Sequence, residues 1–234
     1  MGESSHSRPR RNADRPTLAR VALRTLSLVA PPACVACGRH AGAAEPLCGR
    51  CRRGLPWLGG DPVRIDTSLP LWAPVAHEGP ARALVAALKF RGAVDLAATM
   101  AAQIVASAPP EWLEAAGAAP ILVPVPLHPA RRRRRGFNQA ERIATALGAR
   151  TGLGVADSLE RTGPATRQVG RDSGERRAIR GTVSVRPRGL VPRSALVVDD
   201  VATTGATLAA CAAALREAGA SEVAALAYAR TPGR

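Results

Sequence analysis

The feature that most constrains the fold of this chain is one stretch, Ser194 to Thr207, which reads SALVVDDVATTGAT. Ala195 to Val198 form a continuous apolar run of strand length, as is typical of a strand buried on both faces of a parallel sheet. Asp199 and Asp200 come at its carboxyl end, where open α/β sheets bind their ligands. A turn of small residues follows and opens into an Ala/Leu-rich helix. The pattern therefore predicts an α/β fold with a site at this edge of the sheet.

The turn, Thr203-Thr204-Gly205-Ala206-Thr207, has the composition of a phosphate cradle. Unpaired backbone N–H groups and the dipole of the following helix both favour an anion there. The two adjacent carboxylates can accept hydrogen bonds from vicinal hydroxyls or hold Mg²⁺ through water. A sugar phosphate fits this combination. The alternative is an ordinary strand-loop-helix unit with an N-capping threonine and solvated acids.

Four cysteines form a second motif, with Cys34 and Cys37 in one CxxC pair and Cys48 and Cys51 in another. Two such pairs place four thiolates around a tetrahedral Zn²⁺, which predicts a closed structural site without an open position for substrate. The alternatives are an iron–sulfur cluster or four incidental thiols. The fifth cysteine, Cys211, is most simply a small core residue.

The formal net charge of +15 favours anionic partners, but its distribution matters more than its total. Arginine is abundant throughout, and Lys89 is the only lysine among the 234 residues, which suggests a bias in codon usage. No apolar run approaches the length of a membrane span. The apolar segment Leu18 to Ala30 is interrupted by arginines and lacks a cleavage site, so we expect a cytoplasmic protein with reduced cysteines.

Two basic segments follow predicted strands. Arg131 to Arg135 follow the strand Ile121–Leu127, and we expect them on an active-site loop that contacts pyrophosphate or nucleic acid. A solvated loop is the alternative. The long polar stretch Glu160 to Arg180 is predicted to be a cationic lid over a phosphorylated ligand. Lys89, near the end of a predicted helix, is either a specific point charge or a surface lysine.

The chain is expected to have three parts: a disordered basic tail (1–16), a leading helix with the zinc-ribbon module (17–60), and an α/β domain (61–234). Within the α/β domain we expect the following elements: helices at about 82–92, 94–106, 139–149 and 206–219, and strands at 121–127, 182–185, 195–198 and 222–228.

Together these motifs resemble the ComF family, also called the competence protein F or amidophosphoribosyltransferase-like family. The resemblance covers most of residues 30 to 230 in the family's order, although Ile179 and Val183 depart from its pattern. It implies an N-terminal zinc ribbon joined to a type I phosphoribosyltransferase domain, in which helices flank a central parallel sheet. The matching segments are the paired CxxC motifs, Leu88-Lys-Phe-Arg-Gly92, Val123-Pro-Val-Pro-Leu-His128, Arg135-Gly-Phe-Asn-Gln139, the Gln168/Arg176 region and Val197 to Thr207.

The resemblance implies a ligand, phosphoribosyl pyrophosphate (PRPP), bound with Mg²⁺. Asp199 and Asp200 would meet the ribose hydroxyls as the catalytic residues. The 5′-phosphate would be wrapped by Ala202, Thr203, Thr204, Gly205, Ala206 and Thr207. The pyrophosphate and lid contacts would come from Lys89, Arg91, Arg131, Arg135, Gln168 and Arg176. The implied activity is phosphoribosyl transfer to an unknown acceptor with release of pyrophosphate.

A second hypothesis belongs to a different class of function. Family members are implicated in the uptake of single-stranded DNA, so the chain could be a DNA-binding accessory protein of the uptake machinery with a regulatory or vestigial PRPP site. Basic loops and a zinc ribbon suit contacts to a phosphate backbone. Aromatic residues, however, make up only 3% of the chain, which is few for a platform that stacks bases.

Overall fold

The computed structural model describes residues 32–42, 45–90, 96–113, 119–161, 183–185 and 191–232. The predicted tail (1–16) and leading helix lie outside these ranges. None of the described helices is long and apolar enough to cross a membrane. The helices are α2 (Gly49–Arg53), α3 (Gly79–Phe90), α4 (Leu96–Ser107), α5 (Pro110–Leu113), α6 (Pro129–Arg135), α7 (Gln139–Thr151) and α9 (Ala206–Glu217). The strands are β1 (Val63–Arg64), β2 (Pro70–Trp72), β3 (Val75–Ala76), β4 (Ile121–Pro124), β5 (Leu159–Arg161), β6 (Val183–Val185), β7 (Ser194–Ala202) and β8 (Glu222–Arg230).

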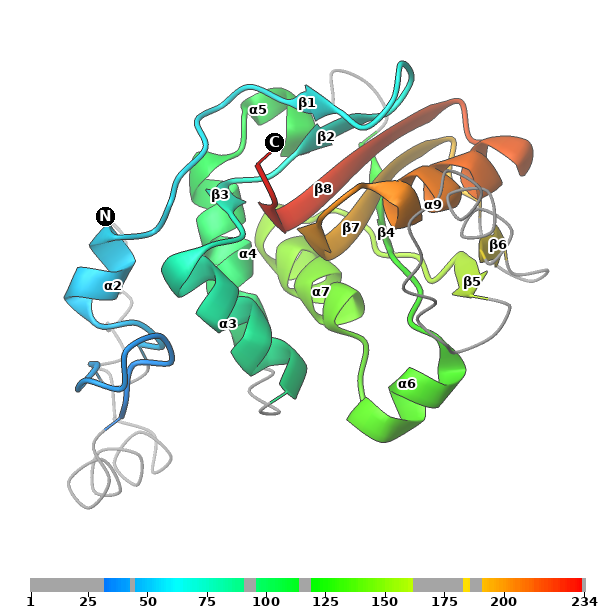
Figure 1. The fold of residues 1–234 in the computed structure, drawn as a ribbon. Helices are drawn as coiled ribbons and strands as arrows, with labels where there is room; N and C mark the ends of the chain where they lie inside the picture. Colours follow the sequence, from blue (N-terminus) through cyan, green and yellow to red (C-terminus); the bar gives the residue numbers. More distant parts are fainter. Residues whose placement is uncertain are drawn as a thin grey trace, which may run out of the picture.

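A six-stranded sheet lies at the centre of the molecule; five strands follow the order β1-β2-β8-β7-β4, and the sixth, β3, also pairs with β8 (Figure 1). The β1–β2 pair is antiparallel, and the other pairs in this sheet are parallel. β2 and β3 both run along β8, where Leu71 is opposite Ala225 and Val75 is opposite Ala229. The break between them includes Pro74, which has no N–H to donate to a sheet. The mixed α/β class with a mostly parallel sheet is as predicted.

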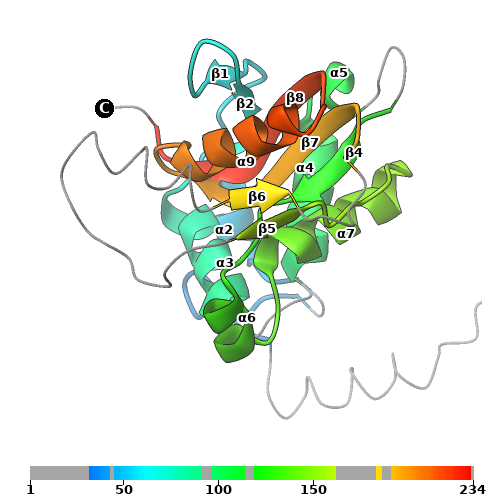
Figure 2. The same ribbon diagram turned by 90° about the vertical axis from the view of Figure 1, so that its right-hand side faces the viewer.

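Helices cover both faces of this sheet. α3, α4 and α7 pack on one face, while α9 and the antiparallel β5–β6 pair lie on the other (Figures 1 and 2). Side chains of β7 alternate between the two layers, as the two-residue period of a strand requires. Leu196 and Val198 belong to the core beneath α3, α4 and α7, whereas Ala195 and Val197 belong to the core beneath α9.

The cysteine-rich segment packs against the same core as the sheet. Cys34, Leu47 and Leu55 are buried in one hydrophobic cluster with Leu84 and Val85 of α3. Burial of these apolar side chains is the main attraction between the two parts. α3, which carries Lys89 near its carboxyl end, therefore packs on the metal-binding segment on one side and on the sheet on the other.

Several of the expected elements differ from the structure. The strand expected at 121–127 ends at Pro124, where its pairing with β7 ends, and the first two residues of the predicted lid belong to β5. The arginine run predicted to lie on a loop forms α6, because His128 caps the helix through its Nδ1, Pro129 takes the first turn and arginine favours helix. Gly136 ends α6 in the left-handed conformation, with φ 82°. β7 also continues past Val198 to Ala202, since β8 pairs with it over that length.

Candidate active site and metal centre

The two acids lie at the point where β7 loses one of its neighbours. β4 pairs with β7 as far as Pro124 opposite Val198, and from Asp199 onward no strand in the described part of the chain pairs with that side of β7. Strand alternation places Asp200 on the face of Leu196 and Val198, and Asp199 on the opposite face. The acids that are adjacent in sequence therefore have different surroundings.

Asp199 lies on the side of the small-residue turn. It lines a cavity of about 40 Å³ together with the residues from Val201 to Leu208. Burial raises the pKa of Asp199 well above its usual value, and the negative charge of Asp200 raises it further, against the opposing effect of Lys89. Its Oδ1 accepts a hydrogen bond from the backbone N–H of Asp200 at 2.8 Å. A carboxyl group with a raised pKa repels a neighbouring phosphate less, because it carries a proton over a wider pH range.

The turn presents unsatisfied backbone donors to this cavity. Within the described ranges, the backbone N–H groups of Thr203, Thr204, Gly205 and Thr207 make no hydrogen bond to a backbone carbonyl. The Ala206 N–H has only a long contact, 3.4 Å, with the hydroxyl of Thr204. These donors stand at the amino end of the twelve-residue helix α9, whose dipole favours negative charge there. The cavity exceeds the roughly 10–15 Å³ that one water molecule needs, so it can hold a small anionic group.

Gly205 is required at the start of α9 for two reasons. Its φ of 73° lies in the left-handed region, which side chains disfavour. A Cβ atom built at this position would also lie 2.6 Å from Cγ2 of Ile65, a residue of the β1–β2 turn. The close approach of Ile65 restricts the backbone of the loop and leaves no room for a side chain at position 205.

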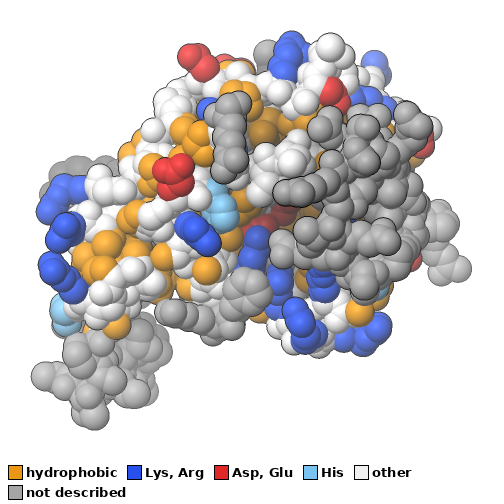
Figure 3. Space-filling model, viewed as in Figure 1, with side chains coloured by type: hydrophobic (Ala, Val, Ile, Leu, Met, Phe, Trp, Pro, Cys, Tyr) orange, Lys and Arg blue, Asp and Glu red, His pale blue; other side chains and the backbone are white. Residues whose placement is uncertain are grey.

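Asp200 is buried and faces α3. Its Oδ2 lies 2.5 Å from Nζ of Lys89, and the two side chains are 4% and 24% exposed respectively. His77, at the carboxyl end of β3, is close enough to sense both charges. Burial lowers the pKa of His77, the positive charges of Lys89 and Arg82 lower it further, and Asp200 opposes them. On the face shown in Figure 3, acidic side chains are recessed near the centre with basic side chains and a histidine around them.

α6 brings a further cation toward the acids. Burial lowers the pKa of Arg135, and the charge of Asp200 opposes this shift, which places the guanidinium within electrostatic reach of that carboxylate. Arg135 also donates a hydrogen bond to Gln139. Buried Asn138 fixes this region, because its Nδ2 donates to the carbonyl of Val125 and its Oδ1 caps α7 through the N–H of Ala140.

The structure thus brings together most of the predicted ligand residues that it describes. Asp199, Asp200, Lys89, Arg135 and the turn from Ala202 to Thr207 all lie at the carboxyl edge of the sheet. Arg131 lies half-buried on α6. Arg91, Gln168 and Arg176 lie outside the described residues. His77 was not predicted, because the two short strands that place it at this edge carry too few residues for a recognisable pattern.

The four cysteines form a metal-binding cluster. Their Sγ atoms all lie within 4.8 Å of one another, and those of Cys37 and Cys48 are 3.7 Å apart. Tetrahedral coordination at a Zn–S distance of about 2.3 Å requires sulfur atoms roughly 3.8 Å apart, so the spacing fits Zn²⁺. Four thiolates close the coordination shell, which makes the site structural.

The thiols of Cys34 and Cys51 differ in their pKa, and therefore in how readily they lose the proton that metal binding displaces. Burial raises the pKa of the Cys34 thiol, but hydrogen bonds from three neighbouring backbone N–H groups outweigh this and lower it to about 6. Burial and the neighbouring cysteines raise the pKa of Cys51 to about 12. A bound cation would favour the thiolate form of both residues, because metal ligation requires deprotonated sulfur.

Comparison with known families agrees with this assignment. Residues 25–63 match the model of the double zinc ribbon domain. The described part of this segment contains one cluster of four cysteines. A comparison with curated proteins finds no match. The N-terminal part of the chain is therefore a zinc ribbon, as the cysteine spacing predicted.

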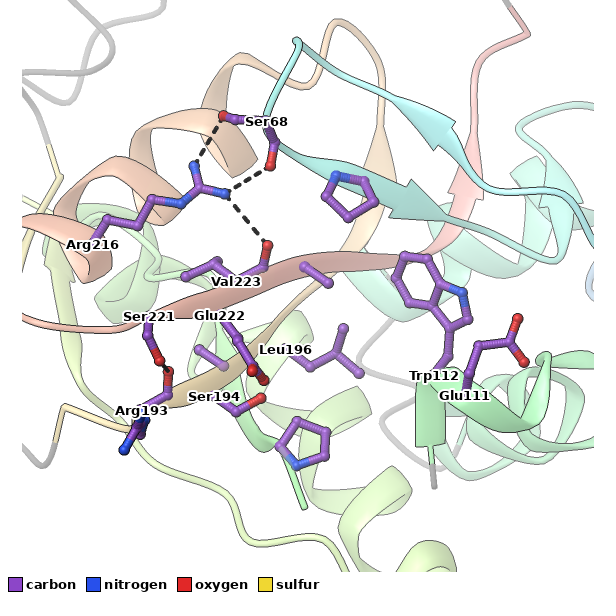
Figure 4. Close-up of a pocket in the computed structure, with 14 residues that line it drawn as sticks. Ser68, Glu111, Trp112, Arg193, Ser194, Leu196, Arg216, Ser221, Glu222 and Val223 are labelled. Carbon is purple, nitrogen blue, oxygen red and sulfur yellow. Dashed lines mark hydrogen bonds between the residues drawn. The ribbon is translucent and has the colours of Figure 1, made fainter. Parts of the chain in front are cut away.

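A larger cavity of about 920 Å³ lies at the opposite, amino-terminal edge of the sheet (Figure 4). The side chain of Trp112 lies on one side of it and that of Arg216 on another. Arg216 donates hydrogen bonds to the carbonyl of Ser68 at 2.9 Å and to its hydroxyl at 3.3 Å, so its charge is already engaged. The strand β7 begins at this cavity and ends at the acids, so the two sites lie at opposite ends of the strand.

Proposed function

We propose that this chain binds PRPP and transfers its phosphoribosyl group to an acceptor, releasing pyrophosphate. The observation that carries the proposal is the turn of unsatisfied N–H groups, Thr203 to Thr207, beside Asp199 and the Lys89–Asp200 pair. The turn offers a place for the 5′-phosphate, and the acids accept hydrogen bonds from the ribose hydroxyls. The position of this group at the carboxyl edge of a parallel sheet supports a type I phosphoribosyltransferase fold and membership of the ComF family.

Each part of the site has a defined task in the transfer. As the bond from the anomeric carbon to the diphosphate breaks, positive charge develops on the sugar, and a carboxylate of the pair stabilises it. Arg135 and Lys89 neutralise the charge that gathers on the departing diphosphate. Mg²⁺ bound with PRPP would supply further neutralisation of the diphosphate; carboxylate oxygens of the kind present here suit it. The zinc ribbon has no open coordination position and takes no part in the chemistry.

Isothermal titration calorimetry with PRPP and Mg²⁺ tests the binding step. Asp200→Asn and Thr204→Ala are expected to abolish measurable binding, because the first removes the carboxylate and the second a hydroxyl of the phosphate turn. Asp66→Asn is the matched control, since Asp66 is an acid of the β1–β2 turn whose Oδ1 accepts hydrogen bonds from Ser68 and Leu69. All variants should retain their zinc. Wild-type-like titrations for Asp200→Asn would contradict the assignment, as would a wild-type protein that binds no PRPP.

Turnover requires a separate measurement. Release of pyrophosphate in the presence of candidate acceptors would establish the transfer, and we expect it to depend on Mg²⁺. A protein that binds PRPP tightly but releases no pyrophosphate with any nitrogen or oxygen nucleophile would be a PRPP-responsive regulator instead.

One observation favours the second function, binding of single-stranded DNA for an uptake machinery. Arg133 and Arg134 of α6 are exposed, and within the described residues neither has an acidic partner. Arg132, by contrast, pairs with Glu141 at 3.1 Å. Exposed, unpaired guanidinium groups can neutralise phosphates of a nucleic-acid backbone.

Fluorescence anisotropy with labelled oligo-dT at several salt concentrations separates the two functions. If DNA is the ligand, Arg133→Ser/Arg134→Ser should reduce both the affinity and the slope of its logarithm against the logarithm of the salt concentration. The same double variant should leave PRPP binding intact. Unchanged anisotropy in the double variant would remove α6 from a DNA interface.

A further inference from the structure

The strongest unexplained contact at the candidate site is the ion pair between Lys89 and Asp200. Lys89 is the only lysine of the chain, and its Nζ lies 2.5 Å from Oδ2 of Asp200. The two residues come from elements far apart in sequence, α3 and β7. The ammonium thus occupies Oδ2, one of the two carboxylate oxygens that could accept a hydrogen bond from a ligand hydroxyl.

Asp200 depends on this contact for its charge. Its side chain is 4% exposed, and within the described residues Oδ2 accepts no hydrogen bond, so the ammonium of Lys89 is its compensating group. An unpaired carboxylate at such a position would destabilise the folded state, because burial removes the water that solvates its charge. A ligand hydroxyl that takes the place of Lys89 on Oδ2 therefore has to donate a hydrogen bond to this oxygen.

The groups around Lys89 determine how favourable it would be for the ammonium to leave Asp200. Among the described residues, the charged and titratable groups that share its surroundings include Arg82 on its own helix, His77 beside β3 and the acids of β7. Arg135 of α6 lies within electrostatic reach of the same carboxylate. An ammonium displaced from Asp200 would be left among cations, which is unfavourable unless an anion arrives with the ligand.

We propose that Lys89 exchanges partners when ligand binds, leaving Asp200 for the diphosphate while a ribose hydroxyl takes its place on the carboxylate. This inference rests on the proposed PRPP site. The exchange makes binding selective for a ligand that carries both the ribose and the diphosphate. A sugar phosphate without the diphosphate would displace the ammonium and leave it without an anionic partner. The diphosphate without the sugar would in turn leave Asp200 uncompensated.

The single lysine makes the exchange directly observable. Protein labelled with [¹⁵N]lysine has one Nζ signal, because Lys89 is the only lysine. With PRPP and Mg²⁺ this signal should shift, whereas ribose 5-phosphate at the same concentration should shift it little. Calorimetry on the same samples reports whether each ligand binds.

Variants measure the contribution of the ammonium. Lys89→Met should weaken PRPP binding by roughly 10- to 100-fold, the effect of losing one charged hydrogen bond, and should leave ribose 5-phosphate binding unchanged or stronger. Urea denaturation of Lys89→Met and of Lys89→Met/Asp200→Asn, which removes both charges, shows whether the unpaired carboxylate of the single variant destabilises the fold; PRPP binding is not compared in the double variant, because Asp200→Asn alone is expected to abolish it. Arg193→Met is the matched control, because Arg193 is an exposed cation at the opposite edge of the sheet.

The outcomes distinguish the exchange from the proposed function. PRPP binding with a shifted Nζ signal supports the exchange. If PRPP binds without shifting the Nζ signal, or binds Lys89→Met with full affinity, the exchange is wrong, whereas the proposed PRPP site is still supported. A wild-type protein that binds no PRPP overturns both.

Discussion

The loop that would hold a phosphate depends on one glycine, and its replacement is the sharpest test of the loop's structure. In Gly205→Ala, the new methyl group would lie 2.6 Å from Cγ2 of Ile65 and 2.8 Å from its Cγ1. Real Cβ atoms do not approach other atoms so closely, so either the loop or the Ile65 side chain has to move. The backbone at Gly205 also has a φ of 73°, which alanine disfavours.

The two effects add. A left-handed residue other than glycine costs about 1–2 kcal/mol. Forcing an extra methyl group into packed space costs about 1–3 kcal/mol more. We therefore expect Gly205→Ala to lower the free energy of unfolding by about 2–5 kcal/mol. Because the displaced segment carries the unsatisfied N–H groups, PRPP affinity should fall as well.

Urea denaturation followed by circular dichroism gives the free energy of unfolding for each variant. Gly152→Ala is the matched control, since Gly152 has a φ of 78° and no heavy atom of the described residues lies within 4 Å of the added Cβ, so only the conformational cost of about 1–2 kcal/mol applies. Ile65→Ala should recover the steric part in the double variant, giving a coupling of about 1–3 kcal/mol. Equal losses in Gly205→Ala and Gly152→Ala, or no coupling to Ile65, would refute the steric reasoning.

Three further predictions concern other parts of the molecule. Cys48→Ser should reduce the zinc content measured by mass spectrometry to background. It should also speed amide hydrogen exchange in α3, because that helix packs on the ribbon. Unchanged exchange in α3 would show that the stability of this helix does not depend on the ribbon. Tyr228→Phe should lower the free energy of unfolding by about 0.5–1.5 kcal/mol, because it removes the hydrogen bond that the buried hydroxyl donates to Gln103 at 2.7 Å; an unaltered urea midpoint would contradict this. The raised pKa of Asp199 means that the folded state holds this proton more tightly than the unfolded state, so its contribution to stability is present at low pH and is lost as the pH rises through the folded-state pKa. Asp199→Asn should therefore gain stability relative to wild type on the alkaline side of that window, and a parallel pH profile for the two proteins would be inconsistent with the shift.

The sequence predicted the local elements well because each is encoded by neighbouring residues. The apolar run before Asp199 predicted a buried strand, and β7 contains it. The spacing of the CxxC pairs predicted four sulfur atoms within reach of one metal, and Cys34 and its partners form that cluster. The arginine run was assigned to a loop because its charge dominated the pattern; its capping residues, His128 and Gly136, instead mark a short helix.

The surroundings of the acids could not be predicted in the same way. Sequence alone placed Asp199 and Asp200 side by side as a pair with one role. In the folded chain Asp199 lines the cavity of the turn, whereas Asp200 pairs with Lys89 of α3. This separation depends on the length over which β8 pairs with β7, and no local pattern gives that length.

By itself, the sequence determined which chemistry the chain can carry: a four-thiolate metal site, a glycine turn at a helix start and two carboxylates at a strand end. Only the tertiary structure decided which charges meet. Lys89 reaches Asp200 because α3 packs across the carboxyl edge of the sheet, more than a hundred residues away along the chain. The physical reason is that hydrophobic periodicity is a local property of the sequence, whereas an ion pair between distant elements depends on how their apolar faces pack.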